Sequence, residues 1–198
     1  MEKKILVYLL LYAITFLSTY FHIEYINNNT NISEYKNLPD LIVDNLPDLS
    51  KSNFTHKIVD YSLLFWCIPI LTNSQFKELS IFVMKMFSII LFLRTLTKSF
   101  TILPSQNNNC KNDSKDLFCY LNGYCNDKIF SGHTSITLLV ILTAIDNKII
   151  EGNNIPLVFI LHIIYVLLIL SSRNHYSVDV ILSYIITTSI FYNLKNII

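Results

Sequence analysis

The chain has 198 residues, a formal net charge of +1 at pH 7 and no block of like charge, so nothing in its charge indicates a nucleic-acid partner. Hydrophobic residues make up 52% of it and charged residues only 15%, whereas a soluble domain usually carries about a quarter charged residues. A large part of its surface must therefore face something other than water, and the composition predicts a membrane protein.

Six apolar stretches qualify as membrane-spanning helices, which predicts an all-α fold: a six-helix transmembrane bundle in which residues 1–198 form a single domain. They are Ile5–Phe21, Ile58–Thr72, Leu79–Leu103, Ser135–Ile150, Ile155–Ser171 and Val178–Leu194. Several are shorter than the roughly 20 residues that a span needs, so their polar flanks must lie at the membrane interface. The second stretch is the weakest, because Asp60 and Pro69 interrupt it. Lys3 and Lys4 precede the first stretch, as lysines do in a signal peptide, but no small-residue cleavage site follows it, so we expect an uncleaved helix.

The lysines in short loops set the expected orientation, because positively charged loops stay in the cytosol. With the N-terminus inside, the cytosolic segments carry Lys3, Lys4, Lys77, Lys148 and Lys195. Two long polar loops, residues 22–57 and 104–130, then face the lumen or the exterior. Both contain Asn-x-Ser/Thr glycosylation acceptors, which favours a protein of the secretory pathway, in the Golgi, the ER or the plasma membrane. The second loop also holds Cys110, Cys119 and Cys125; one pair could form a disulfide, and the sequence does not indicate which.

Two polar segments on this outer side carry the residues suited to catalysis. Residues 125–134 precede the fourth span and contain His133, and residues 174–180 precede the sixth span and contain His175. The fourth span runs inward and the fifth returns, so both histidines emerge on the same face of the membrane. His175 and Asp179 are four residues apart, so a helix that begins at or just before His175 would stack their side chains on one face. The carboxylate can then hold one ring nitrogen and make the other a better nucleophile.

This arrangement predicts phosphoryl transfer through a phospho-histidine. Attack of His175 on phosphorus divides one difficult exchange into two easier displacements. His133 is the candidate general acid and base, and it lies where a helix N-terminus favours a phosphate. Arg94, deep in the third span, is expected to neutralise a phosphate, because a buried cation is costly unless it is paired or faces a wet cavity. The other candidates for substrate contact are Asp127, which also suits a helix cap, Ser131 and Tyr176; neither a metal site nor a cofactor is expected.

These motifs resemble those of the sphingomyelin synthase family, relatives of the lipid phosphate phosphatases of the PAP2 superfamily. The family motif Cys-Gly-Asp-x3-Ser-Gly-His-Thr matches residues 125–134, with Asn126 in place of glycine. The motif His-Tyr-Thr-x-Asp-Val-x3-Tyr-x6-Phe matches residues 175–191, with serine at the threonine position. Weaker similarity extends to Leu-Pro-Asp at residues 38–40, which also suits an ordinary turn, and to Arg94, before which Leu91 replaces the family's tyrosine.

The resemblance implies an outward-facing site in which His175 is the nucleophile, Asp179 its partner and His133 the acid and base. It implies transfer of phosphocholine or phosphoethanolamine from a glycerophospholipid to ceramide, with diacylglycerol as the second product, so the expected partners are membrane lipids. The residues do not decide between choline, ethanolamine and inositol. Two alternatives stay open: a lipid phosphate phosphatase that uses water as the acceptor, and a non-catalytic lipid-sensing protein. The phosphatases' Lys-x6-Arg-Pro segment is not evident here, which favours transfer, and the intact His–His–Asp set argues for catalysis.

Overall fold

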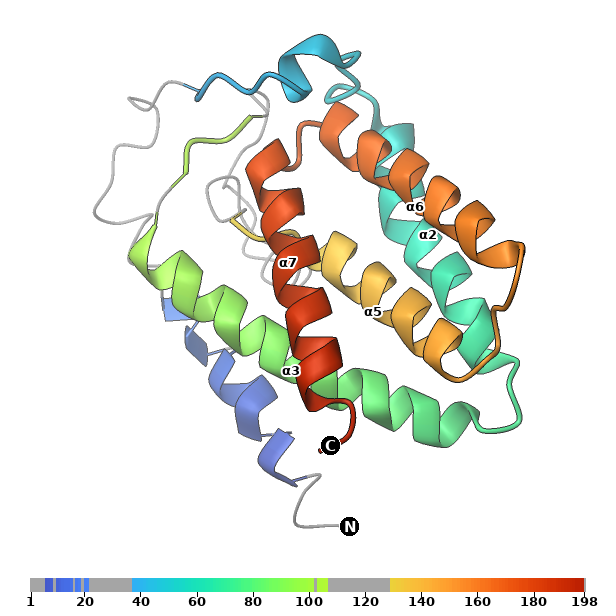
Figure 1. The fold of residues 1–198 in the computed structure, drawn as a ribbon. Coiled ribbons are helices and arrows are strands. Elements are labelled where there is room, and N and C mark those ends of the chain that lie inside the picture. Colours follow the sequence, from blue (N-terminus) through green and yellow to red (C-terminus); the bar gives the residue numbers. More distant parts are fainter. Residues whose placement is uncertain are drawn as a thin grey trace.

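The computed structural model describes residues 6–8, 10–15, 17–18, 20–21, 37–101, 103–106 and 129–197. Within these ranges the regular structure is entirely helical, which confirms the predicted all-α fold. The labelled elements are the short 3-10 helix η2 (Val43–Asn45), α2 (Asn53–Leu71), α3 (Phe76–Phe100), α5 (Gly132–Asp146), α6 (Asn154–Ser171) and α7 (Ser177–Leu194). A further helical segment within residues 6–21 runs beside α3 (Figure 1).

The helices agree with the predicted spans to within a few residues, and the largest difference lies at the start of α2. This helix begins at Asn53, inside the stretch that the sequence assigned to the first loop. Ser52 caps it by accepting a hydrogen bond from the N–H group of Thr55. Pro69 lies in the last turn, and the helix ends two residues later, as expected of a residue that lacks an N–H group.

The shortest of the labelled α-helices, α5, lies at the centre of the bundle, and it packs against α2, α3, α6 and α7 (Figure 1). A helix enclosed on all sides is expected to have no polar face, and residues 137–144 are buried without interruption. Leu138 and Leu139 join the main core with Met86 and Ile90 of α3 and Phe191 of α7. Because α5 is lined by protein, its small polar residues find partners on neighbouring helices.

Large apolar side chains on the outer surfaces of the helices support a membrane environment. Those at least half exposed include Tyr61, Leu64 and Phe65 of α2, Leu157, Ile160, Ile163 and Ile164 of α6, and Ile181 and Ile185 of α7. Residues 76–98 of α3, all of α6 and all of α7 are long and apolar enough to cross a membrane, and Leu6–Thr15 and α5 are shorter apolar helices. The chain is therefore a membrane protein, as its composition predicted.

Candidate active site

The described parts of the two predicted motif segments, residues 129–134 and 174–180, lie where the chain enters α5 and α7, and each turn contains a residue in the left-handed region. Phe130 has φ of 67° and Arg173 has φ of 57°. A bulky residue adopts this conformation at a cost of about 1–3 kcal/mol, so surrounding contacts must hold it. The Phe130 ring is completely buried in the main core. Both turns are thus fixed by side chains that anchor an unfavourable backbone.

Backbone and hydroxyl contacts at Ser131 hold the first turns of α5 and α7 together. Ser131 is the N-cap of α5, and its hydroxyl accepts a hydrogen bond from the N–H group of Thr134. Its own N–H group donates to the carbonyl of Asp179 at 3.4 Å, and its carbonyl accepts from the Ser183 hydroxyl at 3.1 Å. The structure therefore brings the two motifs side by side, although they lie more than 40 residues apart in the chain.

His175 and Asp179 form a buried pair at the start of α7. The Nδ1 atom of His175 lies 3.6 Å from Oδ2 of Asp179, and Asp179 has no exposed surface. The same oxygen accepts a hydrogen bond of 2.9 Å from the N–H group of Tyr176, which closes the N-terminal turn. The other oxygen, Oδ1, is buried and has no hydrogen-bond partner within the described part of the chain. A buried carboxylate oxygen left in this state is costly, and such atoms are characteristic of functional sites.

His133 also has a carboxylate neighbour, and the sequence analysis did not predict it. The Nε2 atom of His133 lies 3.1 Å from Oδ1 of Asp60, which comes from α2. Asp60 was noted only as an interruption of the second span. A carboxylate inside an apolar helix is itself a sign of function, and that signal was sufficient to single it out. The Asp60 side chain is 51% exposed, in contrast to the buried Asp179.

Arg94 reaches from α3 to the start of α5. Its Nε atom donates a hydrogen bond of 2.9 Å to the carbonyl of Phe130, and the side chain is buried. A Cβ atom on Gly132 would meet the guanidinium at 3.7 Å, so Arg94 lies directly beside the N-terminus of α5. The guanidinium and the helix N-terminus both favour a negatively charged group at this position.

A cavity of about 300 Å³ connects these residues. Arg94, Gly132, His133 and His175 supply its polar lining, and Tyr12, Leu63, Phe87, Leu91 and Ile136 supply the rest. Phe87 lies seven residues before Arg94 on α3, so the cavity extends roughly 10 Å along this helix, away from the histidines. Its lining is therefore polar at one end and apolar at the other, as a lipid with a charged head group requires.

Residues 37–52, which we call the strap, hold the turn that carries His175. Oδ2 of Asp40 accepts a hydrogen bond of 2.6 Å from the N–H group of Ser177, and Oδ1 accepts from Ile42 and Val43 at 3.1 Å each. Burial acts to raise the pKa of Asp40, but the hydrogen bonds from Ser177, Val43 and Ile42 outweigh it and leave the pKa below its ordinary value. The Leu-Pro-Asp segment is thus a brace for α7 and more than an ordinary turn.

The second half of the strap binds the residues immediately before His175. Arg173 donates hydrogen bonds to the carbonyls of Val43 and Leu46, and its Nε atom lies 3.7 Å from a carboxylate oxygen of Asp48. The N–H group of Leu49 donates to the carbonyl of Ser171 at 2.8 Å. Leu-Pro-Asp occurs twice in the strap, at residues 38–40 and 46–48, and both copies contact the segment that joins α6 to the start of α7.

The remaining predicted substrate contacts have different positions. Ser131 is fully buried as the cap of α5. The Tyr176 hydroxyl donates to the carbonyl of Pro104 at 3.0 Å and accepts from the N–H group of Leu38, and burial raises the pKa of this tyrosine. Neither residue is among those that line the cavity, so their contact with substrate stays a prediction. Asp127 and the three loop cysteines lie outside the described residues.

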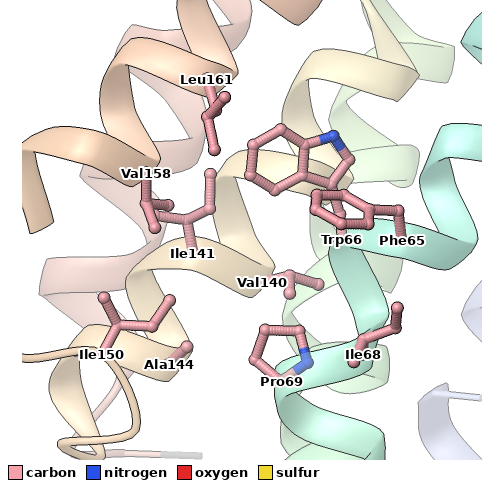
Figure 2. A pocket seen from close by; sticks show the side chains of 10 residues that line it. All are labelled: Phe65, Trp66, Ile68, Pro69, Val140, Ile141, Ala144, Ile150, Val158 and Leu161. Carbon is pink, nitrogen blue, oxygen red and sulfur yellow. The ribbon is translucent and has the colours of Figure 1, made fainter. Parts of the chain in front are cut away.

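A second cavity, of about 170 Å³, lies between α2, α5 and α6 and is separate from the histidines. Figure 2 shows Trp66 and Pro69 of α2 facing Val140 and Ala144 of α5 across it. Every lining residue is apolar, so this cavity offers no group for acid–base or nucleophilic chemistry. Among the residues that the structure describes, no group of three His, Cys, Asp or Glu is arranged to hold a metal ion.

Comparison with known proteins places the motifs in a defined class. Residues 124–197 match the family model described as PAP2 superfamily C-terminal. This segment includes α5, α6 and α7, and with them both histidines and Asp179. The resemblance that the motifs predicted is therefore confirmed.

A curated relative narrows the comparison. The chain is 30% identical over 121 residues to a phosphatidylinositol:ceramide inositolphosphotransferase of Trypanosoma cruzi (strain CL Brener). The match covers 54% of this chain and 36% of the relative, so the chain spans about a third of the length of the curated protein that it matches.

Proposed function

We propose that this protein is a lipid phosphotransferase, which moves a phosphorylated head group from a glycerophospholipid to ceramide through a phospho-histidine at His175. The observation that carries the proposal is the single cavity lined by His133, His175 and Arg94. The PAP2 match over this segment and the ceramide phosphotransferase named above support it. Three head groups remain candidates: phosphocholine, phosphoethanolamine and, as in that relative's name, phosphoinositol.

In the first step, Nε2 of His175 attacks phosphorus and the bond from phosphorus to the diacylglycerol oxygen breaks. His133 gives a proton to the departing alkoxide, so diacylglycerol leaves as a neutral alcohol. The phosphorylated imidazole of His175 carries more positive charge than the free ring. The buried Asp179 carboxylate, with Oδ1 unpartnered in the described part of the chain, is placed to stabilise that charge.

In the second step, His133 takes the proton of the ceramide hydroxyl, whose oxygen attacks phosphorus as the bond to His175 breaks. Both histidines return to their starting states. With Nε2 of His133 held by Asp60, Nδ1 is the nitrogen that exchanges the proton. Arg94 and the N-terminus of α5 bind the phosphate oxygens in both steps.

The cavity's mixed lining supports a lipid substrate in preference to a water-soluble phosphate. Its polar end holds the histidines, and its apolar end lies between the N-terminal helical segment, α2 and α3. In the orientation expected from the lysines, the polar end faces the lumen or the exterior. The reaction would then take place at that leaflet, in a membrane of the secretory pathway.

The test is transfer by the purified protein in liposomes that contain fluorescent ceramide and one phospholipid donor at a time. Phosphatidylcholine, phosphatidylethanolamine, phosphatidylinositol and phosphatidic acid serve as the donors, and mass spectrometry identifies the products. We expect one of the first three donors to give a head-group-bearing ceramide and diacylglycerol, and His175→Ala to reduce product formation by at least about 10³-fold. The control is Asp146→Asn, which alters an ion pair with Lys195 at the opposite end of α5.

Three outcomes contradict the proposal. Inorganic phosphate released from phosphatidic acid without ceramide product indicates a lipid phosphatase. No turnover with any donor indicates a non-catalytic lipid-binding protein. Full activity of His175→Ala excludes this histidine as the nucleophile.

A further inference from the structure

A second polar cluster lies further along the bundle from the two histidines, between α5, α6 and α7. Thr137 of α5, His162 of α6 and Tyr184 of α7 meet there, with Nε2 of His162 at 2.7 Å from the threonine hydroxyl and Nδ1 at 2.6 Å from the tyrosine hydroxyl. His162 has no exposed surface and Thr137 has 1%. None of the three lines the cavity with the catalytic histidines, so the proposed mechanism does not use them.

The neighbouring carbonyls fix the direction of each hydrogen bond in this cluster. The Thr137 hydroxyl lies 2.8 Å from the carbonyl of His133 and donates its single proton there or to the carbonyl of Thr134. It must therefore accept a hydrogen bond from Nε2–H of His162. The imidazole is then neutral with a lone pair on Nδ1, which accepts from the Tyr184 hydroxyl. The chain of donors runs from Tyr184 through His162 and Thr137 to the backbone of His133.

Aromatic rings enclose the cluster and limit it to one arrangement. The Trp66 ring meets His162 edge to face, with centroids 5.4 Å apart, and Tyr165 lies 6.2 Å from the same imidazole. In such apolar surroundings an unpaired donor or acceptor is costly, so a slip of one helix against another would break bonds that nothing else replaces.

We infer that Thr137, His162 and Tyr184 are positioning residues that set the location of His133 relative to His175. Near the ends of the helices, Ser131 joins α5 to α7 at one point. Apolar packing holds α5 in the bundle but is not directional, so one polar contact point leaves small rotations and tilts of α5 without a specific hydrogen bond to oppose them. The second contact, six residues or roughly 9 Å further along α5, removes that freedom, and the effect on turnover rests on the function proposed above.

The first test compares two threonines on the same helix. Thr137→Val keeps the shape of the side chain and breaks the donor chain. The matched control is Thr143→Val, because the Thr143 hydroxyl is equally buried and, within the described part of the chain, donates only to the carbonyl of Leu139 in its own helix. We expect Thr137→Val to lower kcat on the order of tenfold with little change in KM, and Thr143→Val to retain the wild-type kcat.

The second test separates positioning from stability. A triple variant with Thr137→Val, His162→Leu and Tyr184→Phe removes every partner at once, so no buried polar group of the cluster is left unsatisfied. We expect its thermal unfolding to return close to that of the wild type while kcat stays low. A cluster that only stabilises the fold would regain kcat together with its stability.

A third measurement decides the inference even if ceramide is not the acceptor. Diethyl pyrocarbonate modifies exposed imidazoles, and mass spectrometry gives the modification rate of His133 in the full-length protein in liposomes. We expect this rate to change severalfold in Thr137→Val and in the triple variant, but not in Thr143→Val. If His133 reacts at the wild-type rate in all three, the cluster does not position it. Absence of transfer by the wild type, with altered His133 reactivity in the variants, would reject the proposed function and leave this inference standing.

Discussion

The two histidines of the candidate site have carboxylate partners of opposite character. His175 and Asp179 lie close together at the N-terminal turn of α7 and are buried, whereas His133 of α5 meets Asp60 from another helix, and that carboxylate is half exposed. A covalent intermediate needs its charge balanced without rearrangement, which a fixed and buried carboxylate provides. A group that exchanges protons with arriving and departing lipids needs access, which the more open pair provides. The difference in burial thus supports the division of roles between nucleophile and acid/base.

The contacts that hold the backbone around each histidine also differ, and His175 has more of them. The strap binds both sides of His175, after it through the contact of Asp40 with Ser177 and before it through the contacts of Arg173. His133 is held through its own helix, by the cap at Ser131 and the hydroxyl of Thr137. The covalent step therefore has the more rigid surroundings, and substitutions on the two sides should differ in size.

The largest expected effect comes from exchanging the two carboxylates for amides. Asp179→Asn places an amide in a fully buried position against His175, so the ring is held in the wrong tautomer, and we expect kcat to fall by about 10³–10⁴-fold. Asp60→Asn alters the half-exposed partner of His133, and we expect a loss of about 10–100-fold, within the range of general acid–base contributions. Transfer rates at saturating donor and acceptor measure both.

Folding must be verified for this pair of variants, because Asp179 also closes the first turn of α7. Thermal unfolding of each variant in detergent gives that control. If Asp60→Asn lowers kcat as much as Asp179→Asn does, and the two variants are equally stable, the two carboxylates are equivalent. That result would contradict the division of roles between the two histidines.

The sequence predicted the parts of this site that depend on counting and spacing. The apolar stretches located the helices, and the four-residue separation of His175 and Asp179 predicted that the two side chains meet. They meet at the N-terminal turn of α7, with His175 two residues before the helix begins, and not on one face of the helix. The even number of crossings between the motifs put both histidines at one end of the bundle, where the cavity joins them. These features are local, or follow from topology, so they need no knowledge of packing.

The features of the site that the sequence analysis did not predict depend on contacts between segments that are distant in the chain. Asp40 and Ser177 are 137 residues apart, and Asp60 and His133 are 73 residues apart. Their pairing is decided by how α2 and the strap pack against the bundle, and one sequence carries no direct record of that. No motif in the sequence contains His162, and its hydrogen bonds follow only from the packing of α6 against α5 and α7.

We expect an intermediate effect on stability and kcat from a substitution at Asp40 in the strap, and the effect on stability should depend on pH. Because the pKa of Asp40 is lowered in the folded protein, its contribution to the free energy of unfolding is present above the unfolded value of 3.8 and is lost as the pH falls through the lower folded value. We expect Asp40→Asn to destabilise the protein by about 1–3 kcal/mol at pH 7 and to reduce kcat severalfold. Melting temperatures between pH 7 and about pH 3 measure the difference, which should shrink at the acid end. A difference that stays constant down to the lowest pH would show that the charge of Asp40 does not hold the strap.

The smallest effect is expected at the second copy of Leu-Pro-Asp. The pKa of Asp48 is lowered mainly by its hydrogen bonds with Ser50, and its side chain is 59% exposed where it faces Arg173. Exposed ion pairs contribute about 0–1 kcal/mol, and an asparagine can still accept the bond from the N–H group of Ser50. We therefore expect Asp48→Asn to keep kcat within about twofold of the wild type and to shift the melting temperature only slightly. If Asp48→Asn lowers kcat and the melting temperature as much as Asp40→Asn does, the strap holds His175 through the ion pair of Asp48 with Arg173. The hydrogen bond between Asp40 and Ser177 would then not be the main contact.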